Sequence, residues 1–198
     1  YEIGSGLVGS EMCIRDRDES FVDFSEKSVE NTLLKNEVLE TYPHLTVIKS
    51  ISKSYGVPGL RLGIAASSDK EIISYLRKNM AIWNINSFAE FYLQIYSKYN
   101  NDYQNACKKF IAERQRFFEV LQQVDFLRVI PSQANYFLCE VTSRFSSTKL
   151  VSLLLEHNLL LKDCSTKTGF DGRNYIRIAI RDTEDNNYLA ENLKKLQA

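Results

Sequence analysis

The stretch of residues 45–69 constrains the fold of this chain more than any other. Residues 45–50, LTVIKS, are largely apolar and β-branched and predict a buried strand, and a loop rich in glycine follows them. Residues 63–67, GIAAS, predict a second strand, after which Ser68 or Asp69 can cap the start of a helix. Strand, loop, strand and helix in this order are typical of an α/β fold.

Apolar residues at helical spacing dominate the sequence on either side of this stretch. Residues 29–41 predict a helix before the first strand, and a further helix is predicted from Ser87. A break at Asn100 and Asn101 separates that helix from a second, longer one. We therefore assign residues 18–97 to one domain and residues 98–124 to a connecting helix.

A smaller α+β domain is predicted over residues 125–198. Its predicted strands are residues 126–130, 135–141, 159–164 and 175–180, with one helix capped at Ser146 or Ser147 and a closing helix over residues 183–196. In the last strand, isoleucines alternate with Arg177, Ala179 and Arg181, so both arginines are expected on one face.

Composition excludes several classes of function. The 25 Lys plus Arg residues balance 25 Asp plus Glu residues along the whole chain, which argues against a nucleic-acid partner. No apolar run approaches the roughly 20 residues that cross a bilayer, so no membrane association is expected. The four cysteines are scattered and predict reduced, mostly buried thiols in a cytoplasmic protein. The two histidines are isolated, so neither a metal site nor a Ser-His-Asp hydrolase is expected.

The first seventeen residues, YEIGSGLVGSEMCIRDR, do not fit this pattern. They lack the basic start and the apolar centre of a signal peptide, and they resemble a translated adaptor or cloning scar. We therefore expect the fold to begin near Asp18. A chain that starts in mid-pattern is also expected to lack an N-terminal half.

The residues that indicate chemistry follow the first predicted strand. Lys53 stands at the strand end, where partial desolvation and a neighbouring cation can leave its amine neutral and able to form a Schiff base. Ser50, Ser52 and Arg61 offer hydroxyls and a guanidinium that suit a phosphate dianion. The set fits a phosphorylated aldehyde cofactor.

These residues fill the motif Ser-x-Ser-Lys-x-x-Gly-x-x-Gly-x-Arg-x-Gly, and the chain from Asp18 onward resembles the fold-type I aminotransferases that use pyridoxal 5'-phosphate, above all the histidinol-phosphate aminotransferase group. The resemblance implies a mixed, mostly parallel sheet from the end of a large cofactor-binding domain, followed by a small α+β domain. It implies that Lys53 carries the cofactor and that Ser50, Ser52 and Arg61 bind its phosphate.

The segment DESFVDF, which starts at Asp18, resembles the part of this family whose aspartate meets the pyridine nitrogen of the cofactor. The resemblance therefore implies this role for Asp18, whose charge would keep the ring nitrogen protonated. Phe21 departs from the pattern, because many of these aminotransferases have a tyrosine there. This departure favours an assignment to the related threonine-phosphate decarboxylases.

The last predicted strand resembles the strand of this family whose first arginine binds the α-carboxylate of the substrate. Arg177 is implied in that role, and Asn135 lies in a segment that faces the site in the relatives. Arg181 stands where the aminotransferases often have glycine, so its role stays open.

Three functional hypotheses follow. The first is amino transfer between a histidinol-phosphate-like substrate and a 2-oxo acid, by an enzyme that is a homodimer at full length. The second is a threonine-phosphate decarboxylase with the same cofactor. The third is that the chain is an inactive, truncated piece.

Overall fold

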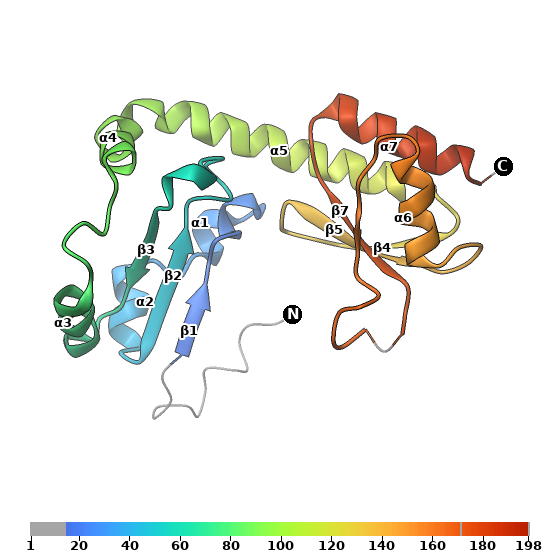
Figure 1. Ribbon diagram of the computed structural model, residues 1–198. Coiled ribbons are helices and arrows are strands. Elements are labelled where there is room, and N and C mark those ends of the chain that lie inside the picture. The colour runs from blue at the N-terminus through green and yellow to red at the C-terminus, as the bar shows by residue number, and fades with distance from the viewer. Residues whose placement is uncertain (1–14, 171, 198) are drawn as a thin grey trace. The chain divides into compact units, whose positions relative to one another are not determined.

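A computed structural model describes residues 15–170 and 172–197 (Figure 1). The chain divides into two compact units between Gln104 and Asn105, inside the long helix α5 (Asn100–Leu121). Each unit is described by itself below.

A three-stranded sheet forms the centre of the first unit. Its strands are β1 (Arg15–Asp18), β2 (Leu45–Ser50) and β3 (Gly63–Ala66). Strand β2 lies between a parallel β1 and an antiparallel β3, so the sheet is mixed (Figure 1). Both strands expected in this stretch are confirmed. Strand β1 includes Arg15, Asp16 and Arg17, which the sequence analysis left outside the fold, and the preceding residues 1–14 lie outside the described residues.

The helix predicted over residues 29–41 is wrong, because this stretch contains two short helices, α1 (Ser28–Asn31) and α2 (Asn36–Thr41). The buried carboxylate of Glu19 accepts hydrogen bonds from Thr32 Oγ1 at 2.7 Å and from the Leu33 backbone N–H at 2.6 Å. These bonds hold Thr32 in an extended conformation and interrupt the helix.

The other helices of the first unit lie where the sequence predicts them, but the expected break at Asn100 and Asn101 is wrong, because both residues belong to α5 and the interruption is the 3-10 segment Tyr96–Tyr99. Helix α3 (Lys70–Asn79) is capped by Asp69, which accepts from the N–H groups of Glu71 and Ile72. Helix α4 (Ser87–Ile95) is capped by Asn86, and a short 3-10 segment leads from it into α5.

The second unit is a four-stranded antiparallel sheet with helices packed against it. Its elements are β4 (Leu127–Ile130), β5 (Tyr136–Val141), α6 (Ser147–Leu155), β6 (Lys162–Asp163), β7 (Tyr175–Ala179) and α7 (Thr183–Lys195), and the strand order is β4-β5-β7-β6. Strand β6 is shorter than predicted, because the Leu159 N–H bonds to the Leu154 carbonyl and closes the end of α6. The alternation in β7 is confirmed, with Ile176 and Ile178 buried and Arg177 exposed.

A continuous apolar core fills the second unit. It includes Phe117 and Leu121 from α5, Phe137 and Cys139 from β5, Leu150 and Leu154 from α6, Ile176 and Ile178 from β7, and Leu189 and Leu193 from α7. Cys139 and Cys164 are buried and Cys107 is half-buried, all three as free thiols, while Cys13 lies outside the described residues. In the described part of the chain, no helix combines the length and the apolar character needed to cross a bilayer.

Candidate active site

Lys53 lies in the turn that follows β2. The turn closes through hydrogen bonds from Tyr55 N to the Ile51 carbonyl at 3.2 Å and from Gly56 N to the Lys53 carbonyl at 3.4 Å. The Lys53 side chain is exposed, and its Nζ lies 5.8 Å from the centroid of the Phe21 ring. The amine is thus accessible and rests over an aromatic face.

Asp18 ends β1 close to the turn of Lys53, because the carboxyl ends of the parallel strands β1 and β2 lie side by side. We call this end of the two strands the strand edge. Its Oδ1 accepts the Ser20 backbone N–H at 2.8 Å. The hydroxyl and the N–H of Ser20 hold the pKa of Asp18 below its usual range, and the positive charge of Lys53 lowers this pKa further. The carboxylate therefore stays ionised near neutral pH.

Ser20 connects Asp18 to the serines after β2. Its hydroxyl oxygen accepts the Ser50 N–H at 2.9 Å, and the Ser50 hydroxyl oxygen accepts the Ser52 N–H at 3.2 Å. Ser20 is buried and was not identified from the sequence. The structure thus gathers four of the predicted residues, Asp18, Ser50, Ser52 and Lys53, at one strand edge.

Arg61 differs from the other four residues predicted to bind the cofactor. It follows the 3-10 turn Pro58–Leu60 with a φ of 53°, and its Nη1 donates to the Pro58 carbonyl at 3.0 Å. Its guanidinium is thus turned to its own loop. Two residues on, Gly63 closes the loop against β2, where an added Cβ would lie only 3.2 Å from the Lys49 carbonyl oxygen.

Arg177 occupies the exposed face of β7 in the second unit. Its guanidinium carbon lies 5.1 Å from the centroid of the Tyr136 ring. Lys162 of β6 is its partner across the strand pair, so two cationic side chains share one face of the sheet.

Asn135 precedes β5 and Arg181 follows β7, so both residues lie at the same end of the β5–β7 strand pair. The Asn135 carbonyl accepts the Ile180 N–H at 3.0 Å, which fixes the start of β5 beside the end of β7. Arg181 forms an ion pair with Asp185, and its backbone N–H bonds to Asn186 Oδ1 at 3.0 Å. The Arg181 guanidinium is therefore held by α7.

Comparison with known proteins identifies the family. The model of the aminotransferase class I and II family matches residues 17–193. The chain belongs to this family. Enzymes of the aminotransferase class I and II family use pyridoxal 5'-phosphate, so both the resemblance and the α/β fold class inferred from the sequence are confirmed.

Both decarboxylases and aminotransferases are among its relatives. L-serine phosphate decarboxylase from Sulfurospirillum multivorans is 34% identical over 183 residues, which cover 90% of this chain and 46% of that protein. Histidinol-phosphate aminotransferase 2 from Archaeoglobus fulgidus is 32% identical over 180 residues, covering 90% of this chain and 48% of that protein. The crystal structure of histidinol-phosphate aminotransferase from Clostridium acetobutylicum superposes with a TM-score of 0.82 at 28% identity, over 92% of this chain and 54% of that one. The chain thus spans about half the length of the relatives it matches.

The donor set at the β1–β2 edge fits the cofactor of this family. An accessible amine, an ionised carboxylate and serine hydroxyls meet the needs of an aldehyde, a pyridine nitrogen and a phosphate, respectively. Lys53, Asp18, Ser50 and Ser52 are the residues that would hold these three groups.

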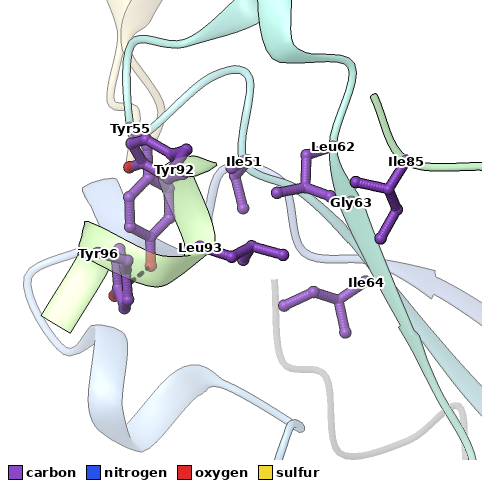
Figure 2. A pocket seen from close by; sticks show the side chains of 9 residues that line it. All are labelled: Ile51, Tyr55, Leu62, Gly63, Ile64, Ile85, Tyr92, Leu93 and Tyr96. Carbon is purple, nitrogen blue, oxygen red and sulfur yellow. Dashed lines mark hydrogen bonds between the residues drawn. The ribbon is translucent and has the colours of Figure 1, made fainter. Parts of the chain in front are cut away.

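An apolar cavity of about 260 Å³ in the first unit borders the turn that contains Lys53 (Figure 2). Side chains of β3, α4 and the turn after β2 line it, and the hydroxyls of Tyr55 and Tyr96 bond to each other at 3.2 Å. None of the predicted cofactor-binding residues is among its lining residues. We therefore place the candidate chemistry at the strand edge and not in this cavity.

One ionic cluster beside Lys53 was missed by the sequence analysis. Asp23 accepts hydrogen bonds from Lys49 Nζ and from Ser54 Oγ, both at 2.7 Å. A sequence signal was present, because a lysine inside the apolar run LTVIKS needs a partner if the strand is buried.

Proposed function

We propose that this chain is part of a pyridoxal-phosphate-dependent enzyme that acts on a phosphorylated amino acid and removes its carboxylate. The observation that carries the cofactor assignment is the accessible Lys53 amine beside the ionised Asp18 at one strand edge. When bound, the cofactor supplies a protonated ring that accepts the electron pair released at the substrate carbon.

Each residue of the strand edge has a separate task in this proposal. The ionised Asp18 holds a proton on the ring nitrogen, because a nearby anion favours the cationic form of that nitrogen. Lys53 holds the cofactor aldehyde and afterwards moves a proton to or from the substrate carbon. The hydroxyls of Ser50 and Ser52 donate to phosphate oxygens.

The charges on β6 and β7 support a substrate with two anionic groups. Like charges directly across a strand pair are unfavourable when no anion lies between them, and Lys162 and Arg177 form such a pair. A phosphorylated amino acid carries a carboxylate for the Arg177 fork and a phosphate for Lys162. The two relatives described above are both named for phosphorylated compounds, L-serine phosphate and histidinol phosphate.

Amino transfer is the second candidate, supported by the identity with histidinol-phosphate aminotransferase 2. Phe21 favours decarboxylation, because it places a ring without a hydroxyl beside Lys53, where many of the aminotransferases have tyrosine. In either case the proposed partners of the enzyme are small molecules. The proposal also includes the homodimer that the family resemblance implies.

The test requires a protein of the relatives' full length that includes this chain. We expect carbon dioxide release from O-phospho-L-serine or O-phospho-L-threonine without any 2-oxo acid, and loss of that release in Lys53→Ala. Arg177→Gln should raise the KM by about tenfold or more, since a charge-assisted hydrogen bond is lost, whereas Arg173→Gln, an exposed arginine of the same unit, should not. Amino transfer that depends on a 2-oxo acid, without carbon dioxide release, would favour the second candidate.

A further inference from the structure

The carboxylate of Asp23 is largely shielded from solvent and lies between two segments. Asp23 lies in the 3-10 turn Val22–Phe24, shortly after Asp18 and Phe21 in the chain. Its Oδ1 accepts from Lys49 Nζ and its Oδ2 accepts from Ser54 Oγ, each at 2.7 Å. The side chains of Lys49 and Asp23 are only 11% and 15% exposed. Each oxygen of the carboxylate thus serves a different segment.

The ion pair fixes where this carboxylate lies. Removing one partner of a buried pair leaves an uncompensated charge, so Lys49 in β2 strongly favours a single position for Asp23. The remaining oxygen is then offered at a fixed point to the hydroxyl of Ser54, the residue after Lys53. At 2.7 Å, this O–H···O bond has the ordinary length for its kind, whereas the two backbone N–H···O bonds that close the turn are long, at 3.2 and 3.4 Å.

We propose that Asp23 is a positioning residue for Lys53. Its hydrogen bond from Ser54 connects the turn that contains Lys53 with the segment that contains Asp18 and Phe21. The inference rests on the proposed function, in which Lys53 is the amine that holds the cofactor. It adds that the Lys49–Asp23–Ser54 chain sets the place from which that amine reacts.

Positioning matters here because the lysine has little support of its own. Its side chain is exposed and flexible, and the Phe21 ring is an aromatic contact at 5.8 Å. A misplacement on the order of 1 Å can slow a reaction by about a hundredfold. Loss of the Ser54 anchor would let the turn drift while the Lys49–Asp23 pair still supports the fold.

The experiment follows covalent capture of pyridoxal 5'-phosphate in the 198-residue chain. The chain is mixed with the cofactor, reduced with borohydride at timed intervals, and the pyridoxyl label is located by peptide mass. Lys98 is the internal reference, because its Nζ also lies over an aromatic ring, that of Tyr99 at 5.4 Å, outside the Asp23 cluster. The measured quantity is the rate of labelling at Lys53 divided by the rate at Lys98.

Ser54→Ala is the decisive variant, since it removes one hydrogen bond and leaves the ion pair. We expect the ratio to fall about fivefold, as for the loss of one hydrogen bond of ordinary strength, and Ser54→Thr to restore it. Ser68→Ala is the matched control, because it also removes one hydroxyl donor, to the Leu39 carbonyl at 2.6 Å. Asp23→Asn should lower the ratio at least as much, and Ser54→Ala added to it should cause no further fall.

The outcomes separate this inference from the proposed function. An unchanged ratio in Ser54→Ala, or an equal fall in Ser68→Ala, would overturn the positioning role while leaving Lys53 as the cofactor lysine. The absence of any label at Lys53 in the unaltered chain would overturn the positioning role, and its absence in a protein of the relatives' full length would overturn the proposed function as well. Because Ser54→Ala keeps the buried pair, the test stands even if Asp23→Asn does not fold.

Discussion

The two units of this protein differ in how many of their large apolar side chains they bury. The second unit buries most of its large apolar side chains in one core between a sheet and its helices. The first unit buries few, among them Phe24, Leu45, Val47 and Ile51, and leaves many large ones exposed: Ile48, Ile64, Met80, Ile82, Trp83, Ile85, Phe88, Phe91 and Leu93. The apolar cavity described above lies in this unit as well. The residues proposed to hold the cofactor therefore belong to the unit with the smaller core of its own.

The largest expected effect of this difference is on hydrogen exchange. We expect strong protection of backbone amides from about Phe126 to Leu196 and weak protection around Lys53, with a difference of about 1,000-fold, because local opening is easiest where few apolar contacts hold the backbone. Exchange followed by mass spectrometry on the 198-residue chain measures it. Equal protection in both regions would show that the first unit is as stable as the second.

Paired substitutions of large aromatic residues sharpen the comparison. Phe137 is 1% exposed and lies against Phe117 and Phe118, with ring centroids 6.1 and 5.7 Å away. Phe137→Ala should lower the free energy of unfolding by about 3–5 kcal/mol. Trp83 is 90% exposed, so Trp83→Ala should change it by less than about 0.5 kcal/mol. Urea unfolding provides both values, and a large loss in Trp83→Ala would mean that this side chain is covered in solution.

Much of this fold could be predicted from the sequence, because its strands and caps depend on local patterns. The runs 45–50 and 175–180 gave strands of the expected kind, and Asp69 and Ser146 cap helices as predicted. The errors came from contacts between distant residues. Glu19 interrupts the predicted helix of residues 29–41 from 13 and 14 positions away in the chain, which no periodicity could reveal.

The candidate site shows the same division between local and distant information. Lys53, Ser50 and Ser52 follow from a contiguous motif, and the structure places them together with Asp18. The role of Ser20 and the Lys49–Asp23–Ser54 chain could not be read in this way, because Asp23 meets its partners across 26 and 31 residues of sequence. Arg61 was predicted from the motif alone, and its hydrogen bond to Pro58 depends on a left-handed backbone that the sequence did not indicate.

The smallest predicted effect is a pH dependence confined to the second unit. Glu113 of α5 accepts hydrogen bonds from Arg116, from Thr183 Oγ1 at 2.9 Å and from Asn186 Nδ2 at 2.7 Å, and so ties α5 to α7. The bond from Arg116, followed by those from Asn186 and Thr183, lowers the pKa of Glu113 to about 2. A depressed folded-state pKa means that the stabilisation is complete above the ordinary pKa of 4.5 and is lost as the pH falls toward about 2.

We expect the free energy of unfolding of the second unit to fall by about 2 kcal/mol between pH 6 and pH 2.5 on account of this group, less than the full shift would give because Arg116 is partly exposed. Glu113→Gln should remove that part of the pH dependence. Glu119→Gln, on the same helix but bonded to Gln115 and not to α7, is the matched control and should retain it. Urea unfolding at several pH values, followed through hydrogen exchange of the backbone amides of β5 and β7, measures the effect in the second unit. An identical pH profile in Glu113→Gln and in the unaltered chain would show that the α5–α7 contact does not depend on this carboxylate.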